Sequence, residues 1–142
     1  MKLIPFLGFN GQTHEAMAFY AKVLRGNVTS ETKYGDMPAS DNMDGCGDAP
    51  GPLDPNLVAH SQLEVGDAIL MAADGPPSDG AGTTTINIDV DSIEEAERVF
   101  KELSEGGKVT MAIGETFWAH RWGMLEDKYG KPWMVNFMKS FP

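Results

Sequence analysis

Cysteine is almost missing from this sequence. The 142 residues include one cysteine, Cys46, so no internal disulfide can form and no cysteine pair exists for a zinc knuckle. A disulfide-stapled secreted domain is therefore excluded. Long hydrophobic runs are missing too: no stretch approaches the roughly 18 apolar residues of a membrane span, and residues 1–5 are too short an apolar run for a signal peptide. We therefore expect a cytoplasmic protein with no membrane partner.

Positive charge is also scarce. Lys and Arg total 11 against 21 Asp and Glu, which gives a formal net charge of -10. Such a surface repels phosphate backbones and anionic lipids, and the cationic residues are scattered without forming a run. We therefore expect no nucleic-acid partner. The chain is 42% hydrophobic and 23% charged, as globular proteins are, and its length suits one domain.

The spacing of apolar and turn residues predicts two similar halves. The first half is predicted to contain a strand at 3–9, a helix from Thr13 to Gly26, strands at 28–34, 57–65 and 68–73, a long Gly- and Pro-rich loop at 35–56, and a linker at 74–82. The second half is predicted to contain a strand at 84–90, a helix that Ser92 caps and Gly106 ends, and strands at 109–113, 116–125 and 132–137.

The order strand, helix, strand, hairpin thus occurs twice, with an offset near 80 residues between Leu3 and Thr84 and between Val28 and Val109. This repeat predicts an α+β fold of paired βαβββ modules. We expect a single domain over 1–142, with modules at 1–74 and 83–142. Each helix would cover one face of its sheet, and the other faces would leave a concave, partly polar pocket between the modules.

Several stretches carry a family resemblance. They are Pro5-Phe6-Leu7-Gly8-Phe9-Asn10-Gly11, Phe19-Tyr20, Ala59-His60, Leu70-Met71, Glu115-Thr116-Phe117-Trp118-Ala119-His120 and the long tail motif from Asp127 to Asn136. Along nearly its whole length the chain resembles the PhnB/YjdN family of the vicinal oxygen chelate superfamily, which includes glyoxalase I, bleomycin-resistance proteins and extradiol dioxygenases. The resemblance implies paired βαβββ modules in a homodimer. Some relatives bear a ubiquinone-pathway methyltransferase label, but no S-adenosylmethionine site is visible here.

The resemblance also implies a divalent metal, held by His, Glu or Gln of the first and last strands of each module. Carried over by position, these places hold Pro5, Met71, Thr85 and Met134, which suit such an ion poorly. No Asp or Glu lies between Asp67 and Asp74 or after Asp127. We therefore expect neither the usual metal nor another cofactor.

Seven polar or aromatic residues are the candidates for ligand binding: His60, Gln62, Glu115, Trp118, His120, Trp122 and Asn136. His60 and Gln62 share the polar face of one predicted strand. Trp118, His120 and Trp122 follow one another at a spacing of two and would share a face. Glu115 could accept a hydrogen bond from a histidine, and Asn136 could orient a ligand. Each also has a structural interpretation, as an exposed sheet histidine, an aromatic core or a satisfied amide.

We therefore expect a homodimeric PhnB-like protein that binds a small molecule in a cleft between its modules, with the loop at 35–56 as a possible lid. Catalysis is left open. One alternative is a metal-dependent lyase or isomerase of glyoxalase type that uses unusual ligands such as His60, His120 and Glu115. Another is a structural or regulatory dimer with a vestigial pocket.

Overall fold

A computed structural model describes residues 1–37, 54–75 and 84–140. The chain divides into two compact units, Met1–Gly80 and Ala81–Pro142. Cys46 and most of the predicted loop at 35–56 and linker at 74–82 lie outside the described residues. No helix within the described residues is long and apolar enough to cross a membrane.

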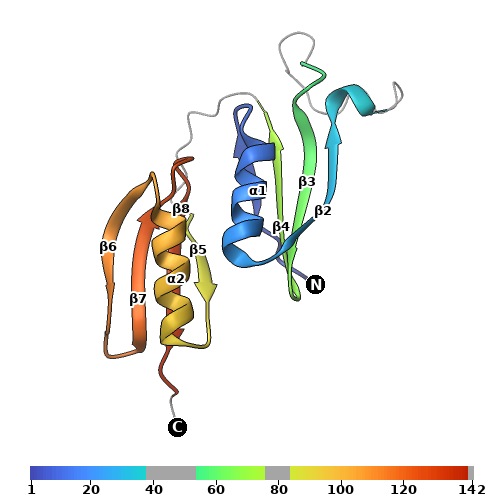
Figure 1. Cartoon of the computed structure of the whole chain (residues 1–142). Coiled ribbons are helices and arrows are strands. Elements are labelled where there is room, and N and C mark those ends of the chain that lie inside the picture. The colour runs from blue at the N-terminus through green and yellow to red at the C-terminus, as the bar shows by residue number, and fades with distance from the viewer. Residues whose placement is uncertain (38–53, 76–83, 141–142) are drawn as a thin grey trace. The chain divides into compact units, whose positions relative to one another are not determined.

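The first unit is a four-stranded sheet with a helix on one face (Figure 1). Its elements are β1 (Phe6–Phe9), α1 (Thr13–Leu24), β2 (Asn27–Lys33), the short 3-10 helix η1 (Tyr34–Asp36), β3 (Val58–Val65) and β4 (Ala68–Asp74). The strand order is β1-β4-β3-β2, and β1 runs parallel to β4 while the other pairs are antiparallel.

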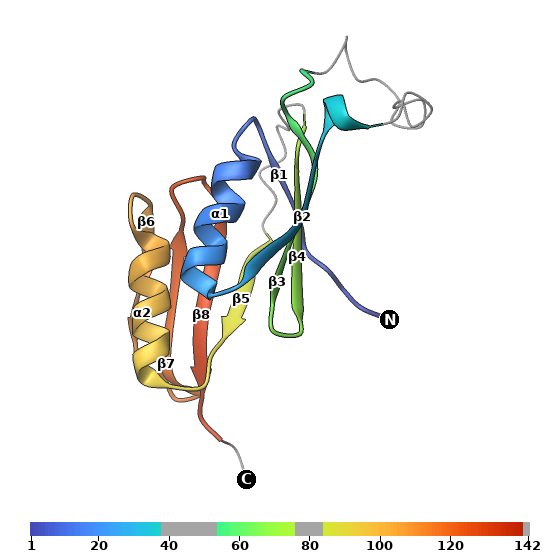
Figure 2. The same cartoon turned by 45° about the vertical axis from the view of Figure 1, so that its right-hand side comes forward.

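The second unit repeats this plan. Its elements are β5 (Ile86–Asp89), α2 (Ile93–Ser104), β6 (Lys108–Gly114), β7 (Ala119–Glu126) and β8 (Pro132–Met138). The strand order is β5-β8-β7-β6 with β5 parallel to β8, and α2 covers one face (Figure 2). The predicted α+β fold of paired βαβββ modules is therefore confirmed.

Each unit buries its own core between helix and sheet. In the first, α1 contributes Ala16, Met17, Tyr20 and Val23, and the sheet contributes Leu63, Leu70 and Ala72. In the second, α2 contributes Ala96, Val99, Phe100 and Leu103, and the sheet contributes Leu125, Trp133 and Val135. The helical residues recur three or four positions apart, which places them on one stripe facing the sheet.

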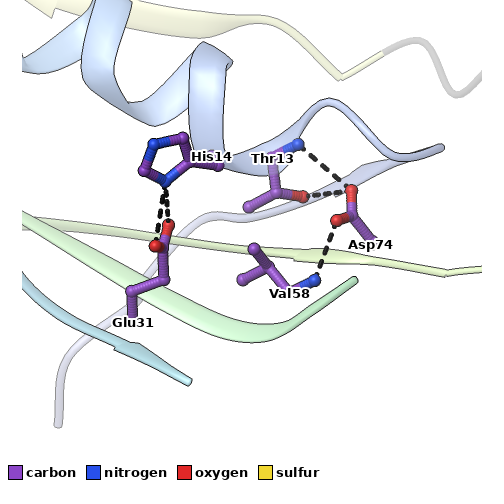
Figure 3. Close-up of polar contacts among 5 residues, drawn as sticks. All are labelled: Thr13, His14, Glu31, Val58 and Asp74. Carbon is purple, nitrogen blue, oxygen red and sulfur yellow. Dashed lines mark hydrogen bonds and ion pairs between the residues drawn. The ribbon is translucent and has the colours of Figure 1, made fainter. Parts of the chain in front are cut away.

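The start of α1 differs from the sequence-based expectation. Thr13 is the first helical residue and does not cap the helix; the carboxylate of Asp74, at the end of β4, does so instead (Figure 3). Asp74 Oδ1 accepts hydrogen bonds from Thr13 N (3.1 Å) and Thr13 Oγ1 (2.7 Å), and its Oδ2 accepts one from Val58 N (2.9 Å). A buried anion facing free N–H groups at a helix start is favourable, so Asp74 belongs to the fold and not to a linker.

The end of α1 also differs from the prediction, because Gly26 is not the residue with the left-handed conformation. Arg25 takes the left-handed conformation at the C-cap, with φ of 57°. Gly26 is required for a close approach instead, because an added Cβ would lie 2.5 Å from Glu64 O. The second helix begins as predicted, with the Ser92 hydroxyl accepting from Glu95 N at 3.1 Å.

The tail motif builds the turn between β7 and β8. Asp127 is buried, and its Oδ1 accepts from Tyr129 N (2.8 Å) and Lys131 N (3.0 Å). Its Oδ2 accepts from Trp133 Nε1 at 2.7 Å, which ties the turn to the core. This part of the resemblance motif therefore specifies a hairpin, and its carboxylate is already engaged.

Candidate functional site

The second sheet has an open face, on the side away from α2. The pairs Gly123–Val135 and Leu125–Trp133 face the helix, since a Cβ on Gly123 would meet Phe100 of α2 at 2.7 Å. Residues that alternate with them face the other way. By register they form three rows across the strands: Lys108, Glu126 and Pro132; Met111, Met124, Met134 and Asn87; and Gly114, Trp122, Asn136 and Asp89.

The middle row is rich in methionine. Met111, Met124 and Met134 are neighbours on β6, β7 and β8, and Asn87 follows on β5. Met111 is 50% exposed, and the other two are half-buried. Unbranched thioether side chains adapt their shape to a bound molecule, so this row is a deformable apolar surface.

Trp122 dominates the next row. Its neighbour on β6 is Gly114, where an added Cβ would meet nothing within 4 Å, so the space beside the indole is unfilled on that side. The ring of Trp118 lies at 5.5 Å from that of Trp122 in an edge-to-face arrangement, and Phe117 contacts Trp118 in the same way at 4.9 Å. The sequence-based pairing of Trp118 and Trp122 is thus present, although β7 begins only at Ala119.

Asn136 is the most buried polar residue of the open face. It is 8% exposed, and its Oδ1 accepts no hydrogen bond from the described residues. Trp122 lies beside it on β7, and Asp89 lies beside it on β5. A buried carbonyl oxygen without a donor costs free energy in the folded state, so this amide is suited to a partner from outside.

His120 and Glu115 have other neighbours. The register is shifted between Ala119 and Arg121, and the ring of His120 contacts that of Phe137 at 4.8 Å. Arg121 turns to the helix side and binds Glu97 of α2 at 3.1 Å. Glu115 precedes β7 and forms an ion pair with Lys139 at 3.7 Å, with its side chain 63% exposed.

His60 and Gln62 lie on the open face of the first sheet. Ser61 and Leu63 face α1, so His60 and Gln62 face away from the helix, as predicted. Their neighbours on that face, in register, are Thr32 beside His60, and Ser30, Met71 and Phe6 around Gln62. Phe6 is 57% exposed. The first unit thus also presents a mixed polar and apolar surface.

Comparison with known proteins identifies the family. The model of the 3-demethylubiquinone-9 3-methyltransferase family matches residues 1–136. Protein YjdN from Escherichia coli strain K12 is 35% identical over 147 residues, which span 100% of this chain and 99% of YjdN. The chain belongs to this PhnB/YjdN family.

Solved structures agree with the fold. A Pseudomonas aeruginosa protein of known crystal structure is 37% identical, with a TM-score of 0.84 over 99% of each chain. A glyoxylase/bleomycin resistance protein/dioxygenase domain from Frankia sp. matches 98% of each chain with a TM-score of 0.66 at 9% identity. At that identity the likeness concerns the fold, which is thus the fold of that superfamily.

The positions at which the family resemblance implies metal ligands hold residues that suit a divalent cation poorly: Pro5, Met71, Thr85 and Met134. Met71 and Met134 lie on open faces, and their register partners on the parallel strands are Phe6 and Asn87. The backbone carbonyl of Pro5 accepts a hydrogen bond from Met71 N at 3.0 Å, so Pro5 lies beside Met71. Thioethers and an aromatic ring are poor ligands for hard or borderline ions, and the Asn87 amide would supply one oxygen. No group of three His, Cys, Asp or Glu that could hold a metal occurs among the described residues.

In the two rows that hold the methionines and Trp122, sequence reasoning did not select Asp89, Met111, Gly114 and Met124 as candidates. Asp89 alternates with the apolar Ile86 and Ile88, so its outward position was visible in the strand pattern. Met111 and Gly114 were not visible in this way, because two register shifts in β6 decide which of its residues face Met124 and Trp122.

Proposed function

We propose that this PhnB/YjdN-family protein binds a flat, largely apolar small molecule on the open face of its second sheet. The observation that carries the proposal is the half-buried indole of Trp122, which has the unfilled space of Gly114 on one side and the methionine row beside it. Aromatic and thioether side chains offer large contact area with little polar cost, as binding surfaces for planar molecules do.

We further propose that binding does not use the superfamily's divalent metal. Support comes from the residues at the positions that the resemblance implies: Pro5, Met71, Thr85 and Met134 offer no carboxylate and no imidazole. The register partners of the two methionines, Phe6 and Asn87, offer none either. A ligand would then be recognised by shape, by apolar contact and by a few hydrogen bonds, and not by chelation of its oxygens.

Tryptophan fluorescence tests the location of binding. The chain has three tryptophans, and Trp133 is buried on the helix side while Trp118 and Trp122 touch each other. A planar compound found by a thermal-shift screen should quench the wild-type emission and that of Trp133→Phe. It should leave the emission of the double variant Trp118→Phe/Trp122→Phe unchanged. Equal quenching in the double variant contradicts the proposal.

A second variant tests the unfilled space. Gly114→Leu should reduce affinity for the same compound by about tenfold or more, since the new side chain would occupy the space beside Trp122. The midpoint of thermal unfolding should stay within a few degrees of wild type, which separates loss of binding from loss of fold. Unchanged affinity in a folded Gly114→Leu protein argues against this face.

Metal content tests the second part of the proposal. Elemental analysis of the purified protein should find no stoichiometric metal, and thermal shift with Ni²⁺, Zn²⁺, Co²⁺ and Mn²⁺ should show no saturable stabilisation. Stoichiometric metal that disappears in His60→Ala or Glu115→Ala would support a lyase or isomerase with unusual ligands instead. A protein that no compound class stabilises would support a structural or regulatory role.

A further inference from the structure

We propose that the ligand of this face is a planar organic cation that carries an N–H donor. The inference rests on the proposed function and narrows it to a ligand class. Three features of one row carry it: the unpartnered carbonyl of Asn136, the carboxylate of Asp89 and the indole of Trp122, which lie side by side on β8, β5 and β7.

Asn136 specifies the donor. The residue is 8% exposed, and its Oδ1 accepts no hydrogen bond within the part of the chain that the structure describes. A ligand N–H beside Trp122 would supply the missing donor. The complex would then be free of the desolvation penalty that the unpaired oxygen causes in the free protein. A ligand that offers only acceptors would leave this oxygen unpaired.

Asp89 specifies the charge. Two rows flank the methionine row. One contains Trp122, and the other contains Lys108 and Glu126, which are register partners of opposite charge. Asp89 has no cation among its register partners, because the residue beside it is Asn136. The charged residues of the three rows are Lys108, Glu126 and Asp89. Lys108 and Glu126 balance each other, so the Trp122 end of the face carries one unbalanced negative charge. The formal net charge of -10 adds a long-range attraction for cations.

The indoles favour the same ligand. A delocalised cation that lies near an indole face gains electrostatic attraction from the ring in addition to apolar contact. Trp122 and Trp118 stand edge to face at 5.5 Å, so they offer differently oriented ring surfaces at one place. A planar anion would meet repulsion from the ring faces and from Asp89.

Three planar compounds of similar size separate the ligand classes by isothermal titration calorimetry at neutral pH. Proflavine is a cation with N–H donors, acridine is neutral, and anthracene carboxylate is an anion. We expect proflavine to bind at least about fivefold more tightly than acridine, and anthracene carboxylate to bind most weakly. Equal affinities for proflavine and acridine would overturn the inference.

Asp89→Asn tests the charge, with Asp91→Asn as the matched control, because Asp91 is exposed and lies beyond β5. Asp89→Asn should weaken proflavine by about three- to fivefold and leave acridine unchanged. Asp91→Asn makes the same change in net charge and should leave both affinities near wild type. Equal losses in the two variants would assign the effect to net charge alone and contradict the inference.

Asn136→Leu tests the acceptor. It should weaken proflavine and leave the thermal midpoint equal to or above that of wild type, since it removes a buried oxygen that lacks a donor. A lower midpoint with unchanged affinity would mean that the amide has a structural role, and the inference would fail. If acridine binds and its signal is lost in the tryptophan double variant while proflavine gains nothing, the proposed function stands and this inference falls. If neither compound is affected by the tryptophans, both fall.

Discussion

Asp74 links three parts of the first unit, two through its carboxylate and one through its backbone carbonyl. Its carboxylate accepts from Thr13 N, Thr13 Oγ1 and Val58 N, and its backbone carbonyl accepts from Tyr34 Oη at 2.8 Å. Asp74→Ala would leave Thr13 N, Thr13 Oγ1 and Val58 N buried without this acceptor. The bond from Tyr34 Oη to the backbone carbonyl would remain. We expect it to lower the free energy of unfolding by about 3 kcal/mol, as measured by urea denaturation.

Asp67→Ala is the matched control for this change. Asp67 is exposed in the turn between β3 and β4, so its removal should change stability by no more than about 0.5 kcal/mol. Similar losses for both variants would show that the carboxylate of Asp74 is not what holds the start of α1.

A second buried carboxylate, that of Asp127, connects the turn between β7 and β8 to the core of the second unit. Asp127 Oδ2 accepts from Trp133 Nε1, and both side chains are buried. In a double-mutant cycle with Asp127→Asn and Trp133→Phe, we expect a coupling free energy of about 1–2 kcal/mol from denaturant unfolding. Strict additivity would contradict a direct interaction. Because Trp133→Phe is also the fluorescence control above, its ligand affinity should remain that of wild type.

At the residue scale, sequence reasoning identified which face of a sheet a residue lies on better than which groups a buried side chain contacts. His60, Gln62, Trp122 and Asn136 do lie on the faces turned away from the helices, because strand alternation fixes that choice. The role of Asp74 was hidden because the residue stands between an apolar strand and a Gly-Pro-Pro stretch, where composition predicts a linker. Its donors are distant in sequence, and no local pattern reveals them.

At the element scale, two glycines of the second sheet predict opposite outcomes. Gly123 of β7 lies against α2, and an added Cβ would meet Phe100 at 2.7 Å. Gly123→Ala should therefore overpack the helix–sheet core and cost about 1–3 kcal/mol. A Cβ added at Gly114 of β6 would meet nothing within 4 Å. Gly114→Ala should therefore be neutral or slightly stabilising.

Thermal unfolding of the two alanine variants measures this difference directly, since both add one methyl group to the same sheet. A larger loss in Gly114→Ala than in Gly123→Ala would mean that the face of β6 beside Trp122 is already filled. That result would also remove the main support for ligand binding there.

The elements themselves were largely predictable, because two periodicities and a few turn residues determine them. The helices, the hairpins and their repetition follow from apolar spacing and from Gly, Asp and Pro positions. The start of β7 did not follow: residues 116–118 precede the strand, because Thr116 N donates to Ala119 O and Ala119 N donates to Thr116 Oγ1. The alternation expected for Trp118, His120 and Trp122 is then broken by the register shift next to Ala119.

At the scale of the whole molecule, duplication explains why the two units share one arrangement of strands. Each unit repeats one strand order, so equivalent positions occur on two open faces. Met71 and Met134 occupy equivalent places on these faces, because each pairs with the first strand of its own unit, at Phe6 and at Asn87. Topology could be predicted because the repeat encodes it twice, while the ligand could not, since it depends on which side chains the register brings together.

The exposed apolar surface of one chain leads to a last prediction. In the second unit Phe117 is 84% exposed and Met138 47%. Large aromatic and methionine side chains are enriched where two proteins meet. We propose that a second copy of the chain covers part of this surface in a homodimer. Light scattering after size exclusion should give twice the chain mass of 15.4 kDa at micromolar concentration. Phe117→Lys should increase the monomer fraction because it places a charge on that surface, and a wild-type monomer under these conditions would contradict the proposal.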